Sequence, residues 1–170
     1  MPGLWIERKF SYDHLTEAEF PSLVDRLRAT PARIEDTVKD LSRELLTRRD
    51  GEKWSIQEQV GHLLEVDALH DGRLDDYHTG ASVLRAADME NKRTHAARYN
   101  DRPFEDVLAA FRGVRGRFVE RLDAWEPGRR LAVALHPRLQ QPMRVVDMLL
   151  FAAEHDGHHL ERMAELARRG

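Results

Sequence analysis

Three stretches of the chain carry apolar residues at the spacing of an amphipathic helix. They cover about residues 21–46, 103–125 and 143–168, and in each of them leucine, valine, isoleucine, phenylalanine or methionine recurs at intervals of three, four and seven. Asp50-Gly51 follows the first stretch and Glu126-Pro127-Gly128 follows the second, and both are strong helix-ending signals. We therefore predict one helix in each stretch.

A further helix is predicted from Ser55 to about Tyr77. The segment Ser55-Ile56-Gln57-Glu58 has the form of a capping box, in which the serine and the glutamate each satisfy a free amide of the first turn. Trp54, just before the cap, is placed to act as a hydrophobic staple. His78-Thr79-Gly80 ends the pattern.

The remaining segments are less regular. Residues 81–102 are polar and mixed, with at most a short helix near 83–91, and we expect this connection to cross one end of the molecule. Val133 to Leu135 could be a short extended piece, but no clear sheet is predicted. The chain is thus predicted to be all-α, an antiparallel-type four-helix bundle forming a single domain over residues 1–170.

Composition narrows the class of protein. The formal net charge of −3 gives no overall positive field to attract phosphates, so a nucleic-acid partner is not expected. No run of about 18 apolar residues and no signal peptide is found, so we predict a cytoplasmic protein without a membrane partner. The absence of cysteine excludes disulfides, thiolate ligands and a cysteine nucleophile within the chain.

The candidate chemistry comes from histidines. His155 and His159 lie four residues apart on the last predicted helix, so their side chains share one face, close enough to bind one metal ion. On a helical wheel both fall on the apolar stripe, whereas His158 lies nearly a quarter turn away. His62, on the helix that starts at Ser55, can supply a third nitrogen, which would place a metal site between predicted helices 2 and 4.

Other interpretations of these residues stay open. Buried histidines are often only hydrogen-bonded parts of a core. Glu58 lies one turn before His62 and could orient that ring or act as a catalytic base, but its capping role also explains it. His155-Asp156-Gly157-His158-His159 has aspartate where a zincin helix has glutamate, so protease activity is not expected. The Glu-x-x-His spacing of a di-iron bundle is absent.

Two motifs together resemble the DinB-like (DinB/YfiT) superfamily. They are the segment from Trp54 to His62 and the His-x-x-x-His pair about ninety residues later. The resemblance implies a four-helix bundle with a divalent ion, commonly zinc or nickel, at one end, often in a homodimer. It carries the metal ligands onto His62, His155 and His159. The stretch from His136 to Arg144 looks like a feature of one subgroup, and we assign it no role.

The function expected from this resemblance is metal-dependent chemistry on a small-molecule substrate. Some relatives transfer groups with low-molecular-weight thiols and others look like hydrolases, so a thiol transferase is expected ahead of a hydrolase. A three-histidine site with an open position would suit either activity. The alternatives are a non-catalytic metal-binding stress-response bundle and a metal-free helical dimer.

Overall fold

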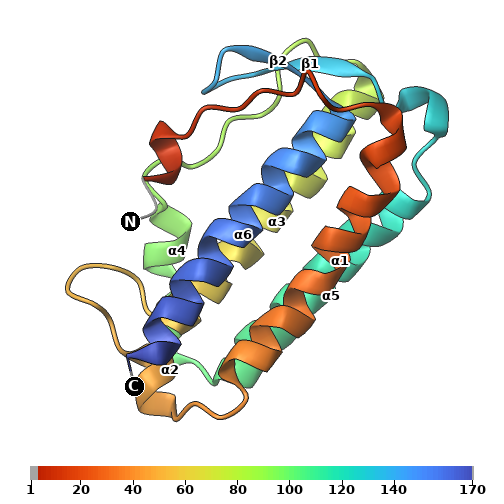
Figure 1. Cartoon of the computed structure of the whole chain (residues 1–170). Helices are drawn as coiled ribbons and strands as arrows, with labels where there is room; N and C mark the ends of the chain where they lie inside the picture. Colours follow the sequence, from red (N-terminus) through yellow and green to blue (C-terminus); the bar gives the residue numbers. More distant parts are fainter. Residues whose placement is uncertain (1–3, 170) are drawn as a thin grey trace.

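The computed structural model describes residues 4–169 and consists mainly of four long helices (Figure 1). Its elements are η1 (Trp5–Glu7), η2 (Glu17–Glu19), α1 (Phe20–Val38), α2 (Arg43–Thr47), α3 (Ile56–Thr79), α4 (Lys92–Ala96), η3 (Tyr99–Asp101), α5 (Phe104–Asp123), η4 (Pro127–Arg129), β1 (Val133–His136), β2 (Gln141–Arg144) and α6 (Val145–Arg168). The prediction of an all-α four-helix bundle is confirmed. Each predicted long helix is present; α3, α5 and α6 have ends within about two residues of the prediction, whereas α1 ends eight residues early, at Val38.

The segments between the long helices differ from the prediction in detail. The first predicted helix is two helices, because Ser42 accepts a hydrogen bond from the amide of Leu45 and so caps a separate α2. No helix forms near 83–91; Leu84 pairs instead with Leu135 of β1, and the short helix α4 comes later. The extended piece at Val133 to Leu135 is confirmed, but as one strand of an antiparallel hairpin with β2 that was not expected.

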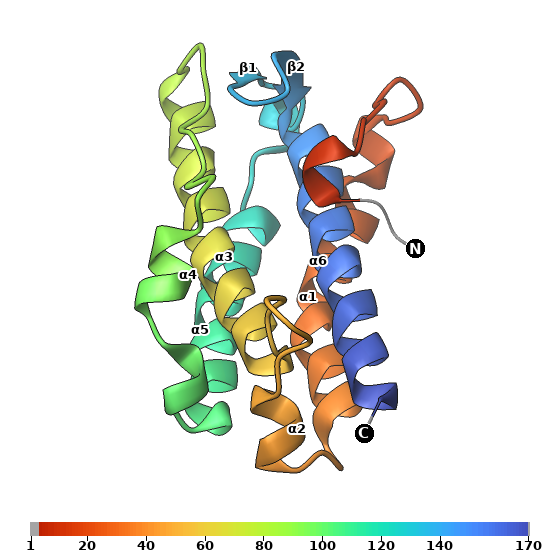
Figure 2. The same ribbon diagram turned by 90° about the vertical axis from the view of Figure 1, so that its left-hand side faces the viewer.

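The connection over residues 81–102 does not cross one end of the bundle. It runs back along the outside of the bundle, from the hairpin end to the end where α2 lies (Figures 1 and 2). Helices α3 and α5 therefore run in the same direction, and so do α1 and α6, while the two pairs are antiparallel to each other. Hydrophobic periodicity shows which face of a helix is buried but not which helix packs against that face, so the relative directions of the four helices could not be predicted from the sequence.

A buried polar layer divides the core of the bundle. One apolar cluster lies toward the hairpin end and the other toward α2. Between them each long helix contributes one buried polar residue: Thr30, Asp67, Arg115 and Asp156. The Arg115 guanidinium donates to both carboxylates, with its Nε 2.7 Å from Asp67 Oδ2 and its Nη1 2.6 Å from Asp156 Oδ2. The hydroxyl of Thr30 donates to Asp156 at 2.6 Å.

A proline completes this layer. Pro31 lies inside α1 and has no N–H, so the carbonyl of Leu27, four residues earlier, lacks its usual helical partner. Arg115 Nη1 donates to that carbonyl at 2.7 Å. The guanidinium thereby contacts α1, α3 and α6 from α5, which fixes how far each helix can slide along its neighbours and hence the relative heights of side chains on α3 and α6.

Candidate metal centre

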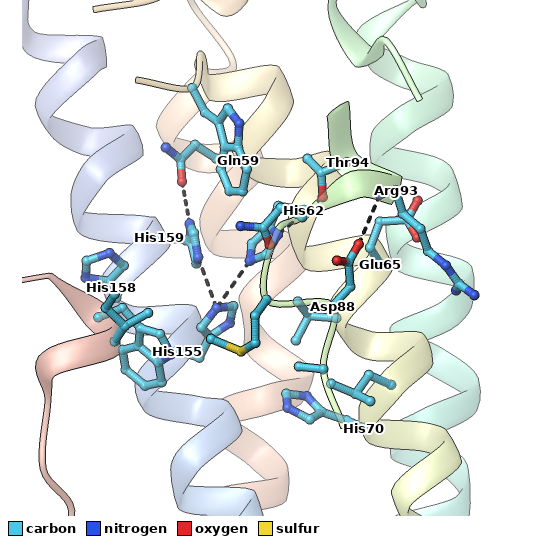
Figure 3. Close-up of a pocket in the computed structure, with 18 of the residues that line it drawn as sticks. Gln59, His62, Glu65, His70, Asp88, Arg93, Thr94, His155, His158 and His159 are labelled. Carbon is cyan, nitrogen blue, oxygen red and sulfur yellow. Dashed lines mark hydrogen bonds between the residues drawn. The ribbon is translucent and has the colours of Figure 1, made fainter. Parts of the chain in front are cut away.

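The structure brings His62, His155 and His159 together. The Nε2 atom of His155 lies 3.4 Å from Nε2 of His62 and 3.1 Å from Nε2 of His159 (Figure 3). His62 comes from the second turn of α3, and the other two come from the middle of α6. All three are buried, so the predicted inward placement of the pair on α6 is confirmed.

Hydrogen bonds fix the orientation of two of the rings. His159 Nδ1 bonds with the side-chain oxygen of Gln59, one turn before His62 on α3. Because that oxygen can only accept, the proton of His159 is on Nδ1 and the lone pair of its Nε2 points toward His155. His62 Nδ1 lies 3.4 Å from the hydroxyl of Thr94 on α4. Contacts of this kind orient the histidine ligands of metal sites.

Two tryptophans cover the cluster. Trp54 packs against His62 with ring centroids 4.7 Å apart, so it contacts the site as well as preceding the cap. Trp5, in η1, packs edge-on against His155 at 5.0 Å. His155 Nδ1 has no hydrogen-bond partner in the part of the chain that the structure describes. His158 is half-buried, packs on Trp5 and is not part of the three-histidine cluster.

Burial keeps the three rings uncharged. It lowers the pKa of His62 to about 4, with a smaller contribution from His158. Burial also lowers the pKa values of His155 and His159 well below the ordinary value, and neighbouring histidines add to this effect. All three are therefore neutral at pH 7, and a neutral imidazole has the free lone pair that a metal ligand needs.

The cluster fits a metal ion by its spacing. One ring nitrogen from each histidine lies within 4.8 Å of the other two. An ion bound by nitrogens at 2.0–2.1 Å in tetrahedral geometry holds them about 3.3 Å apart, close to the two Nε2 separations found. His155 Nε2 faces the Nε2 atoms of both other rings, but it either carries one proton or has one lone pair, so without an ion only one of the two contacts can be an ordinary hydrogen bond. A cation would accept a lone pair from all three rings, so the cluster fits a cation better than a purely hydrogen-bonded core.

A cavity of about 1130 Å³ opens onto the cluster. All three histidines line it, together with residues of α3, α6, the 81–102 connection, the hairpin loop and η1. Leu4, Ile6 and Met89 also line it and are largely exposed, which gives the mouth an apolar rim. A ligand entering from solvent could therefore reach the ring nitrogens.

Glu58 is occupied by structural contacts. Its carboxylate accepts from the Ser55 amide at 3.0 Å and from Arg49 Nε at 2.8 Å. Burial raises the pKa of Glu58, but the hydrogen bonds from Arg49 and Ser55 outweigh burial and hold that pKa below its ordinary value. Glu58 does not line the cavity. The capping box is confirmed, and a catalytic role for Glu58 remains a prediction.

Several residues around the cluster were missed in the sequence. Gln59 could have been found, since it lies three residues before His62 and so shares its helical face. Thr94 and Trp5 belong to segments without periodicity, and nothing in the sequence placed them here. Two cavity-lining carboxylates, Glu65 and Asp88, were also missed; Glu65 accepts a hydrogen bond from the Tyr99 hydroxyl at 2.6 Å.

Comparisons with known proteins support this description. No curated protein matches the chain. Among solved structures, YfiT from Bacillus subtilis is similar, with 19% sequence identity, a TM-score of 0.79 and coverage of 95% of this chain and 93% of that one. It is described as "a probable metal-dependent hydrolase with an unusual four-helix bundle topology". The family model described as DinB superfamily matches residues 26–163. The chain therefore belongs to the DinB superfamily.

Proposed function

We propose that this protein is a divalent-metal-dependent enzyme acting on a small organic molecule. The observation that carries the proposal is the convergence of three neutral imidazoles at an open cavity. A purely structural metal site is normally closed, with every coordination position filled by protein. The accessible cavity therefore favours catalysis over a non-catalytic metal-binding bundle.

His62, His155 and His159 would hold the ion, with zinc or nickel as the proposed metal. The chemistry supplied by such an ion is Lewis acidity, which activates a thiol or a water molecule as a nucleophile. Gln59 and Thr94 contact the Nδ1 atoms of His159 and His62 and would thereby leave the Nε2 atoms of these two rings free to bind the ion. None of these ligands carries a negative charge that would weaken the Lewis acidity.

We propose thiol transfer ahead of hydrolysis as the reaction. The cavity, at about 1130 Å³, exceeds the roughly 300–1,000 Å³ typical of a site for one small molecule, so it has room for a thiol and an electrophile together. Because the chain contains no cysteine, the thiol would be a separate low-molecular-weight cofactor. Glu65 is the proposed acceptor of the proton lost by the nucleophile, through its carboxylate in the same cavity.

Metal content is the first measurement. Protein purified without a histidine tag should contain about one divalent ion per chain, and His155→Ala should lose it. His158→Ala should keep the ion, because His158 is outside the cluster. Turnover would then be assayed with low-molecular-weight thiols plus an aryl halide, and separately with simple esters and amides. Turnover by metal-depleted His155→Ala protein at the wild-type rate would refute the proposal.

A further inference from the structure

A buried arginine without a carboxylate partner lines the same cavity, beyond the histidine cluster. Arg73 follows His62 by eleven residues on α3, about 16 Å along the helix axis. It is 1% exposed, and its Nε and Nη2 atoms donate to the backbone oxygen of Arg85 at 3.1 and 3.0 Å. None of the ion pairs found within residues 4–169 includes Arg73. A buried charge of this kind is costly unless something compensates it.

His136 faces this arginine with a second hydrogen-bond donor. The amide of Leu139 donates to His136 Nδ1 at 3.2 Å, so Nδ1 carries no proton. Burial lowers the pKa of His136 to about 4, with contributions from Arg73 and Arg138, so the ring is neutral at pH 7. A neutral imidazole with a bare Nδ1 has its proton on Nε2. That Nε2 lies 3.4 Å from Arg73 Nη1, so two donors face each other.

The arginines that line the cavity differ in whether a carboxylate pairs with them. Arg138 also lines the cavity, lies over the Phe151 ring and has no ion-pair partner among the described residues. By contrast, Arg85 pairs with Asp76 and Arg162 pairs with Glu165. The Asp76 carboxylate also acts on Arg73, but it is already paired with Arg85. The part of the cavity around Arg73 and His136 therefore carries net positive charge and two facing donors without an acceptor between them.

We infer that Arg73 and His136, with Arg138 adding charge, bind an anionic oxygen group, a carboxylate or a phosphate, of the small molecule on which the enzyme acts. An anionic oxygen would accept from both facing donors and compensate the buried guanidinium. That the same molecule also reaches the metal centre rests on the function proposed above.

The positions of the two sites set the length of such a ligand. The His136 ring packs on Phe151 with centroids 5.2 Å apart, and Phe151 lies one turn before His155 on α6. One turn of helix and one ring contact add up to about 10 Å, which is an upper limit for the distance from the His136 ring to the cluster because the two steps need not lie on one line. The ligand would thus have its anionic group no more than about 10 Å from its reactive end.

The test measures anion binding in the absence of metal. Wild-type protein treated with EDTA would be titrated with succinate and, separately, with inorganic phosphate, and followed through the arginine and histidine N–H signals in NMR spectra. We expect saturable binding that Arg73→Gln weakens at least tenfold, equivalent to about 1.4 kcal/mol. Arg162→Gln, the matched control, removes a cavity arginine whose charge is already paired and should leave the affinity unchanged.

Two further variants make the outcome decisive. His155→Ala should lose the metal and keep the anion affinity, so failure of the metal proposal and failure of this inference are distinguishable. If Arg73→Gln does not fold, His136→Phe removes the second donor and should weaken binding in the same direction. Preference for succinate or for phosphate would identify the anionic group. Equal affinity in wild type and Arg73→Gln, or no saturable binding by wild type, would overturn the inference.

Discussion

Replacing Arg115 with methionine should destabilise the bundle strongly. The change removes two hydrogen bonds to Asp67, at 2.7 and 2.8 Å, two to Asp156, at 2.6 and 3.0 Å, and one to the Leu27 carbonyl. Both carboxylates stay buried, at 1% and 4% exposure, without their cation. Removing one partner of a buried ion pair costs about 3–5 kcal/mol. Because the Arg115 guanidinium pairs with two carboxylates, we expect the free energy of unfolding to fall by an amount near the upper end of this range.

Thermal unfolding gives the magnitude directly. For a chain of this size 1 kcal/mol corresponds to roughly 2–4 °C, so the melting temperature at pH 7 should fall by about 10–20 °C. Arg121→Met is the matched control on the same helix. Its ion pairs with Asp71 and Asp75 lie near the surface, with Arg121 and Asp71 each 36% exposed, and pairs in contact with water contribute about 0–1 kcal/mol. The melting temperature of this control should therefore fall by only a few degrees.

The pH dependence tests the cause of the loss. Burial already raises the pKa of Asp67 to about 6, against the opposing effect of Arg115. A carboxyl group whose folded pKa lies above its unfolded value gains stability as the pH falls through the folded pKa. Without Arg115 this pKa rises further, so the deficit of Arg115→Met should shrink between pH 7 and pH 5. A drop below about 3 °C at pH 7, or a deficit independent of pH, would refute the reasoning.

Two other substitutions probe the surroundings of the cluster. Gly61→Ala would place a Cβ about 2.2 Å from the Tyr99 ring, so it should lower the free energy of unfolding in urea by about 1–3 kcal/mol. The control Gly116→Ala places its Cβ where nothing lies within 4 Å and should be neutral or stabilising. Equal effects of the two substitutions would argue against the close contact between Gly61 and Tyr99. Gln59→Leu should lower metal affinity about 10–100-fold in chelator competition, because His159 loses its acceptor. Gln59→Glu should retain affinity, and an unchanged affinity in Gln59→Leu would contradict the orienting role.

Local geometry explains what could be predicted from the sequence. The pairing of His155 and His159 follows from the helix alone, since residues four apart share a face whatever surrounds them. The capping box at Ser55 is equally local, and the structure contains it. The convergence with His62 came from the family resemblance, because no local rule says which helix packs against which.

The predictions that failed depended on tertiary contacts. The path of residues 81–102 is set by where this segment docks on the bundle. The break before Ser42 is an exception, because it follows from a local serine cap within a stretch whose apolar spacing continues. Arg73 could not be recognised either: in the sequence it is one arginine among many between acidic residues, and only its burial without a carboxylate distinguishes it.

The outward path of residues 81–102 has a practical consequence for redesign. The candidate metal ligands stand on α3 and α6, whose spacing is fixed by the bundle, whereas much of the cavity wall comes from this connection, the hairpin loop and η1. Surface connections accept insertions and deletions at little thermodynamic cost. The volume and chemistry of the cavity can therefore be engineered by changing these segments, while the three histidines keep their positions on an unaltered scaffold.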